Sequence, residues 1–144
     1  MGGIRIGVLV GILALVAGGV GAIKAFGSDS RTSATTVKIT ATEMKLFASA
    51  NRVSAGKVTF VVRNAGLVEH EFVVLRTDAP VSAVPVVNFK AEEDQVGEVV
   101  DEAEDIEPGK TARLTVNLKP GKYLLLCNVV GHFQLGMRTS FRVT

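Results

Sequence analysis

From about residue 36 onward the chain is a series of short segments in which β-branched and apolar residues alternate with polar ones. The alternation is clearest in KVTFVVR (57–63) and ARLTVNL (112–118), and it indicates strands with one buried face. Turn-forming sequences, such as Asn-Ala-Gly and Lys-Pro-Gly, separate the segments. About six or seven strands with turns at this spacing predict an all-β fold, either an antiparallel sandwich or a barrel.

Residues 78–107 interrupt the series because they show no clean strand pattern. We expect an excursion between the two halves of the domain there, with a short helix in it. Residues 92–107 of this segment carry nine acids and no Lys or Arg. Such a run most often lies on a solvated loop or helix, and a docking patch is the alternative. Lys and Arg are scattered singly elsewhere, so nucleic-acid binding is not expected.

An unbroken run of apolar and small residues, 6–23, precedes the strands. The run is long enough to cross a bilayer as a helix, which takes about 20 residues, whereas the apolar region of a signal peptide usually has about 7–15. We therefore predict a membrane anchor, or alternatively a signal segment, in residues 1–26, a linker in 27–35 and one folded domain in 36–144. Both alternatives place the domain on the extracytoplasmic side, periplasmic or cell-surface.

Cys127 is the only cysteine of the chain, so it cannot form an internal disulfide. A lone thiol in an exported protein is open to oxidation unless it is buried, paired between chains or bound to a metal. Cys127 closes the run YLLLC (123–127), which predicts a core strand. Taken alone, it would be interpreted as a small buried apolar residue.

Three potential metal donors stand close together in CNVVGHFQLGM, where Cys127, His132 and Met137 are each separated by four residues. The only other histidine, His70, lies far upstream in EHEF. Two histidines and a cysteine, with a long and weak axial methionine, are the ligands of blue copper. Both histidines and the single cysteine fall into this pattern, which argues against coincidence. We predict one copper ion that cycles between Cu(I) and Cu(II) on His70, Cys127, His132 and Met137.

The segments VRNAGLVEHEFVV (62–74) and GKYLLLCNVVGHFQLGMRTSFRV (121–143) resemble the cupredoxin family of type 1 blue copper proteins. The resemblance covers about residues 36–144, and the ligand spacing is closest to that of auracyanin and rusticyanin. It implies a Greek-key β-sandwich with copper at one end and with His132 as the solvent-facing electron port. In azurin an asparagine that follows the first ligand histidine braces the ligand loop, whereas this chain has Glu71 there, and Asn128 is the candidate replacement.

We expect a one-electron carrier, not an enzyme, that works between exported or membrane-bound redox partners. Copper storage or delivery is the alternative, but such proteins usually expose several Met or His ligands, and Met44 is the only methionine left after the initiator. A mononuclear copper enzyme is less favoured, because it needs an open coordination position. The enzyme alternative requires that a water molecule binds the metal in place of Met137. Glu69 or Glu71 as an alternative ligand is a variant of it.

Four apolar residues flank the expected ligands in sequence: Leu67, Val68, Phe133 and Leu135. Each can pack around the copper or contribute to an apolar docking surface around His132. Exposed apolar patches often mark docking sites, and redox partners typically meet through small interfaces.

Overall fold

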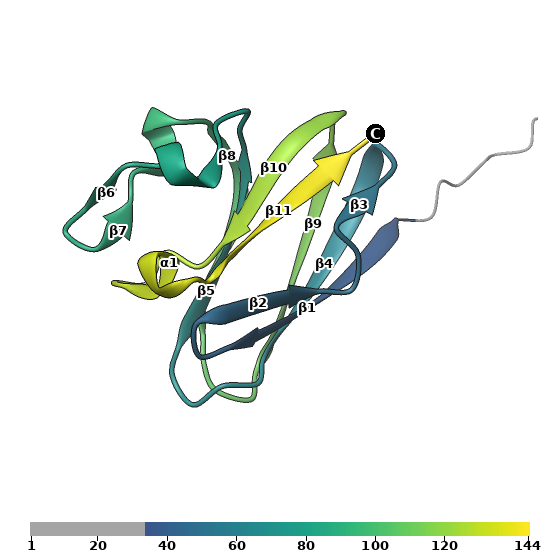
Figure 1. The fold of residues 1–144 in the computed structure, drawn as a ribbon. Helices are drawn as coiled ribbons and strands as arrows, with labels where there is room; N and C mark the ends of the chain where they lie inside the picture. Colours follow the sequence, from purple (N-terminus) through teal and green to yellow (C-terminus); the bar gives the residue numbers. More distant parts are fainter. Residues whose placement is uncertain (1–33) are drawn as a thin grey trace, which may run out of the picture. The chain divides into compact units, whose positions relative to one another are not determined.

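The computed structural model describes residues 34–144, so the expected anchor or signal segment and most of the linker lie outside the described residues. The elements follow one another along the described part of the chain (Figure 1). The strands are β1 (Thr35–Thr42), β2 (Lys45–Ala48), β3 (Arg52–Val53), β4 (Gly56–Asn64), β5 (His70–Arg76), β6 (Val86–Val87), β7 (Lys90–Ala91), β8 (Glu98–Ile106), β9 (Thr111–Leu118), β10 (Gly121–Leu126) and β11 (Arg138–Val143). The helical turns are η1 (Val81–Ala83), η2 (Glu93–Gln95) and α1 (His132–Leu135). Within residues 34–144 no helix has the length and apolar character needed to cross a membrane.

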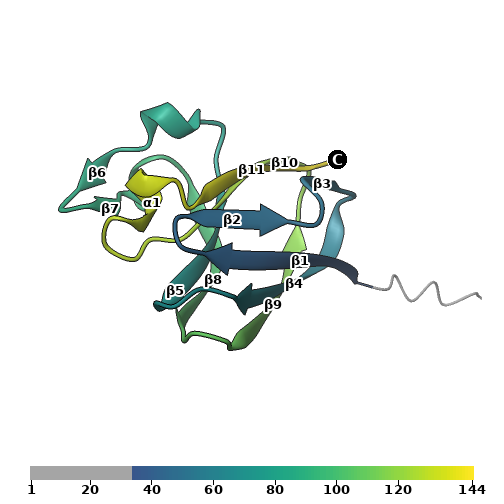
Figure 2. The same ribbon diagram turned by 60° about the horizontal axis from the view of Figure 1, so that its bottom comes forward.

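Two main sheets pack face to face as a sandwich (Figures 1 and 2). One has the strand order β2-β1-β4-β9 and the other the order β3-β11-β10-β5-β8. The predicted all-β fold is therefore confirmed. The sandwich is not wholly antiparallel, because β1 pairs with β4 and β3 pairs with β11 in parallel.

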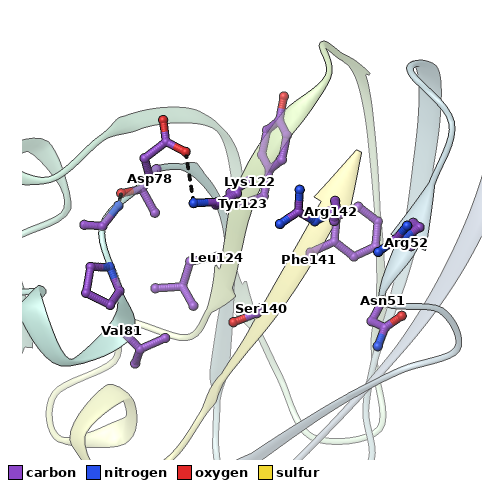
Figure 3. Close-up of a pocket in the computed structure, with 13 residues that line it drawn as sticks. Asn51, Arg52, Asp78, Val81, Lys122, Tyr123, Leu124, Ser140, Phe141 and Arg142 are labelled. Atoms are coloured by element: carbon purple, nitrogen blue, oxygen red, sulfur yellow. Dashed lines mark hydrogen bonds and ion pairs between the residues drawn. The ribbon is translucent and has the colours of Figure 1, made fainter. Parts of the chain in front are cut away.

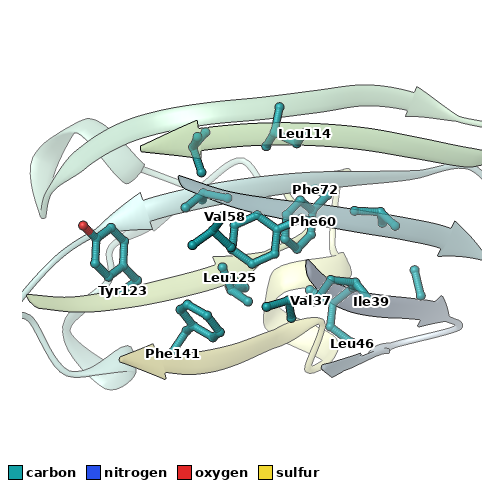
Figure 4. Close-up of a cluster of buried hydrophobic side chains, with 14 of the residues drawn as sticks. Val37, Ile39, Leu46, Val58, Phe60, Phe72, Leu114, Tyr123, Leu125 and Phe141 are labelled. Atoms are coloured by element: carbon teal, nitrogen blue, oxygen red, sulfur yellow. The ribbon is translucent and has the colours of Figure 1, made fainter. Parts of the chain in front are cut away.

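The core between the sheets is built from the apolar positions of the alternating segments. Along β4 the inward side chains of Val58, Phe60 and Val62 are fully buried. The Phe60 ring lies 5.3 Å from that of Phe72 and 5.6 Å from that of Phe141, between centroids, so three strands from both sheets meet in one aromatic cluster (Figure 4). Burial of one such side chain contributes about 1.5–3 kcal/mol.

The strands β5 and β10 differ from the others because both of their faces are buried. Their inward residues, such as Phe72 and Leu125, belong to the core between the sheets. Their outward residues, such as Leu75 and Leu126, form a second apolar cluster that also contains Phe133 and residues of the excursion. Burial on both faces explains why these two segments read as continuous apolar runs instead of alternating ones.

The excursion is shorter than expected, and most of the acidic stretch is a strand, although Glu93–Gln95 form the short helical turn η2. Residues 78–97 contain η1, η2 and the β6–β7 hairpin, which lies beside α1 in both views (Figures 1 and 2). The prediction is wrong for residues 98–106, which form the nine-residue strand β8 at the edge of the second sheet, antiparallel to β5. The sequence hid this strand because two register shifts between β5 and β8 break the period of two, and because most of its side chains are exposed acids.

Candidate metal centre

His70 and Cys127 meet because their strands are antiparallel neighbours. His70 is the first residue of β5, and Cys127 directly follows the last residue of β10. In the ladder between these strands Leu126 lies opposite Val73. The end of β10 therefore lies beside the start of β5, and two residues far apart in the sequence come together at one end of the sandwich.

His132 and Met137 reach the same place through the loop between β10 and β11. Gly131 and Gly136 bracket the single helical turn α1 with φ values of 83° and 120°, which glycine adopts without the steric cost that other residues bear. The loop is closed by its own backbone, because the N–H of Cys127 donates to the carbonyl of Met137 and the N–H of Met137 donates to that of His132, both at 3.0 Å. The close spacing of these donors in the sequence thus becomes a compact loop.

The side chains of His70, Cys127 and His132 converge on one point. Nδ1 of His132 lies 3.3 Å from Nδ1 of His70 and 3.4 Å from Sγ of Cys127. One donor atom from each of the three residues lies within 4.8 Å of the other two. His70 and Cys127 are fully buried, while His132 keeps 8% of its surface exposed. The arrangement offers two nitrogens and one sulfur to a single ion.

Burial sets the protonation of these groups. It lowers the pKa of His70, with the neighbouring His132 adding to the effect, and it lowers the pKa of His132. Both imidazoles are therefore largely neutral at pH 7 and have a lone pair to offer. Burial raises the pKa of Cys127, against the opposing effect of the backbone N–H groups of Glu71 and Val129. The thiol must release its proton when a metal binds.

This donor set fits copper better than a hard cation. A neutral imidazole suits copper, and a thiolate is a soft ligand that selects it, whereas Mg²⁺ and Ca²⁺ take oxygen ligands. The three donors also include no carboxylate. His70, Cys127 and His132 are therefore positioned to bind a single copper ion.

Met137 lies at the end of the ligand loop, next to Cys127 across the closing hydrogen bond. Its side chain is fully buried and belongs to the same core cluster as Cys127. A buried thioether here has the right softness for a weak axial ligand. Its role as the fourth ligand remains a prediction.

Asn128, the candidate replacement for the asparagine that braces the ligand loop, hydrogen-bonds to the β6–β7 hairpin. Its Oδ1 accepts the N–H of Ala91 at 2.7 Å, and its Nδ2 donates to the Ala91 carbonyl at 3.0 Å. The N–H of Gly131 also donates to the Phe89 carbonyl at 2.8 Å. Asn128 thus ties the β6–β7 hairpin to the ligand loop. The sulfur of Cys127 accepts a bond from the backbone N–H of Glu71 at 3.3 Å.

The loop before His70 is held by Asn64, which we did not single out from the sequence. Asn64 is fully buried, and its Nδ2 donates to the carbonyls of Val68 and Ile106, both at 2.7 Å. Its Oδ1 accepts the N–H of Gly66 at 2.8 Å, which is the Asx turn that favours asparagine at such positions. The Asn-Ala-Gly sequence indicated a turn at this position, but not that Asn64 holds the loop. Glu43 also binds this loop, and no local pattern pointed to it.

The four apolar residues around the site divide into two groups. Phe133 is buried, and the guanidinium of Arg138 lies 4.7 Å from its ring centroid while also donating to its carbonyl. Leu67, Val68 and Leu135 are exposed, at 87%, 43% and 65%. The side chain of Phe133 therefore packs into the second apolar cluster. The other three side chains remain available as an apolar surface.

A cavity of about 430 Å³ lies at the opposite end of the second sheet (Figure 3). Its lining includes Arg52, Asp78, Lys122 and Arg142, and Lys122 forms an exposed ion pair with Asp78 at 3.7 Å. Lys122 is near the start of β10, whereas Cys127 follows its end, about 17 Å away at strand spacing. No histidine or cysteine of the described chain lines the cavity. It is separate from the metal centre.

Solved structures with a similar fold include auracyanins and a rusticyanin. Reduced auracyanin of Roseiflexus castenholzii is 19% identical with a TM-score of 0.58, covering 77% of this chain and 98% of that one. Auracyanin A of Chloroflexus aurantiacus, described as a blue copper protein, is 23% identical with a TM-score of 0.55 over 76% and 98%. Rusticyanin of Thiobacillus ferrooxidans is 20% identical with a TM-score of 0.53 over 78% and 79%. Identities this low show a common fold and nothing finer.

A search of curated proteins finds no match to this chain. The model of a cupredoxin-like domain, by contrast, matches residues 11–137, which is most of the sequence. It includes all four residues that the sequence pattern singled out as donors. By this match, and in agreement with the sandwich and the grouping of His70, Cys127 and His132, the chain belongs to the cupredoxin family.

Proposed function

We propose that this protein is a type 1 blue copper protein that carries single electrons, with His70, Cys127 and His132 as strong ligands and Met137 as the weak axial ligand. The observation that carries the proposal is the convergence of two buried imidazoles and one buried thiol within 4.8 Å. When bound, the copper ion supplies the one-electron Cu(II)/Cu(I) couple.

The packing around the donors suits electron transfer. Cys127 and His70 are held by β10 and β5, the two strands that are buried on both faces. Close-packed interiors resist displacement of their side chains, so the ligands need to move little when the charge of the ion changes. Full burial of His70 and Cys127 also limits access of water and substrate, which favours a carrier over a mononuclear enzyme or a protein that hands its copper on.

The surface around His132 is the proposed place for electrons to enter and leave. Among the three converging residues His132 alone keeps measurable exposure. The exposed apolar side chains of Leu67, Val130 and Leu135 lie on the two segments that carry the ligands. A small apolar contact of this kind suits a transient encounter with an electron donor or acceptor protein.

We also propose an extracytoplasmic location, with residues 6–23 anchoring the chain to a membrane. The support is the length of the apolar run. Fractionation tests it: the full chain is expected to stay with the membrane after an alkaline carbonate wash and to be digested by protease added to spheroplasts, in which both the periplasmic and the cell-surface side are accessible. Release by the wash, or protection from the protease, contradicts the anchor or the location.

Titration of the purified full chain with Cu(II) tests the proposed function. We expect one equivalent to produce an intense blue thiolate charge-transfer band that bleaches on reduction and returns on oxidation. A colourless complex contradicts the blue copper site. Rapid loss of the copper to a competing chelator would favour storage or delivery instead.

A further inference from the structure

The two-residue turn between β1 and β2, Glu43–Met44, lies against both segments that carry the proposed ligands. The Glu43 carboxylate oxygen Oε1 accepts the N–H of Leu67 at 2.5 Å and that of Val68 at 3.2 Å. On the other side, a methyl group placed on Gly136 would lie 3.2 Å from the Met44 carbonyl oxygen. One short turn therefore touches the loop before His70 and the end of the loop that carries Met137.

The contact between Glu43 and the loop depends on Gly66. A methyl group placed on Gly66 would lie 2.3 Å from Oε1 of Glu43 and 2.8 Å from its Cδ, which is far inside van der Waals contact. A methyl group at position 66 would therefore displace the Glu43 carboxylate, and with it the hydrogen bonds to the N–H groups of Leu67 and Val68. The backbone of the loop passes directly over the Glu43 side chain, and two of its N–H groups point at one oxygen.

The same oxygen faces a ligand ring. Nδ1 of His70 points toward Nδ1 of His132, which in turn lies beside the Cys127 sulfur, so Nδ1 is the nitrogen that a shared metal ion would use. The other nitrogen of His70, Nε2, is buried and has no hydrogen-bond partner among the described residues. Oε1 of Glu43 lies 3.9 Å from it. When Nδ1 binds a metal, Nε2 carries the proton, and a carboxylate is the usual kind of partner for such an N–H.

Resting on the proposed function, we propose that Glu43 is a positioning residue of the copper centre. Its carboxylate fixes the loop before His70 and places a negative charge next to the ligand imidazole. A charge there stabilises the site more when it carries the extra positive charge of the oxidised ion, so Glu43 lowers the reduction potential. It braces the loop before His70 from the β1–β2 turn with a charged group, whereas Asn128 braces the Cys127–Met137 loop with an amide.

Two Glu43 variants of the full chain separate the mechanical part from the electrostatic part. Glu43→Ala removes both the loop contacts and the charge, so we expect faster hydrogen exchange at the Leu67 and Val68 amides and a higher reduction potential. Glu43→Gln keeps an acceptor oxygen of similar reach, so it should restore much of the amide protection but leave the potential raised. If Glu43 had only a structural role, Glu43→Gln would restore both the amide protection and the wild-type reduction potential.

Glu69→Gln is the matched control, because it removes the same charge one residue from His70, and the Glu69 side chain makes no hydrogen bond to the loop backbone among residues 34–144. We expect it to leave the Leu67 and Val68 exchange unchanged and to raise the potential less than Glu43→Gln does. The proposal is overturned if Glu43→Ala leaves the exchange unchanged, or if Glu43→Gln has the wild-type potential or one no higher than that of Glu69→Gln.

Gly66→Ala gives an independent test through the same contact. In the wild-type chain the added methyl collides with the Glu43 carboxylate, so the thermal midpoint should fall. In the Glu43→Ala chain the same methyl finds space, so the fall should be smaller. Equal falls in both backgrounds contradict the contact. Hydrogen exchange and unfolding are measured on the copper-free chain, so they decide the bracing role even if no blue complex forms.

Discussion

The two segments that bring donors to the metal centre are stabilised in different ways. The loop from Cys127 to Met137 is closed by its own backbone hydrogen bonds. The loop before His70 depends on side chains from elsewhere: Asn64 at the end of β4 and Glu43 in the β1–β2 turn. The first segment closes on itself and is in addition tied to the β6–β7 hairpin by Asn128 and Gly131, whereas the second has its shape only in the assembled fold. Substitutions in the two segments should therefore have different consequences.

Cys127→Ser should have the largest effect, and it acts on chemistry alone. The hydroxyl keeps nearly the same shape but is not ionised at neutral pH, so the blue band should disappear completely. The absorption spectrum after addition of Cu(II) measures this. Retention of the band would mean that the thiolate is not its source, and the proposed ligand set would be wrong.

Asn64→Ala should show how strongly the loop before His70 depends on side chains from elsewhere in the fold. The substitution leaves the carbonyls of Val68 and Ile106 without their buried donor, and such losses cost about 1–3 kcal/mol each. We expect the free energy of unfolding of the copper-free chain to fall by about 2–4 kcal/mol in denaturant titrations.

Asn117→Ala is the control for Asn64→Ala, because Asn117 is exposed on β9. It should change the free energy of unfolding by no more than about 0.5 kcal/mol. A loss of similar size in the two variants would show that the loop before His70 is not held by Asn64 and would remove the contrast between the segments.

The pH dependence of copper affinity should distinguish the thiol donor from the two imidazole donors. Burial raises the pKa of Cys127, so binding displaces a proton from the thiol, and affinity should rise by about tenfold per pH unit between pH 7 and 8. His70 and His132, whose pKa values burial lowers, are already neutral in this range and displace none. Competition with a chelator at several pH values measures the slope. A flat profile would mean that Cys127 is already a thiolate before copper binds.

Met137→Leu should have the smallest effect on stability. The swap nearly conserves volume, so the free energy of unfolding should change by less than about 1.5 kcal/mol. The blue colour should remain and the reduction potential should rise, because a weak donor is lost. An unchanged potential in Met137→Leu would argue against the axial role.

The sequence predicted the fold where burial is simple. In β4 and β9 one face is buried and the side chains alternate, so the period of two is visible. It failed at β8, where register shifts disturb the period and exposed acids replace the usual β-formers. Strand identity there comes from pairing with β5, which a single segment cannot reveal.

The same division applies to the site. Cys127, His132 and Met137 stand in one short loop, so their grouping was visible in the sequence, and His70 could be added because it is the only other histidine. Glu43 could not be found in this way, because its partners Leu67 and Val68 are 24 and 25 residues away. Carboxylates are common on surfaces, and only the fold shows which one faces a ligand ring.

The acidic edge strand has a consequence for how copies of this protein behave together. β8 ends the second sheet, and an edge strand presents unpaired N–H and C=O groups to which another chain can add. Glu98, Asp101, Glu102, Glu104 and Asp105 project along this edge as exposed side chains. Two copies that approached edge to edge would bring these like charges together, so the strand that completes the sheet also disfavours edge-to-edge pairing with a second copy.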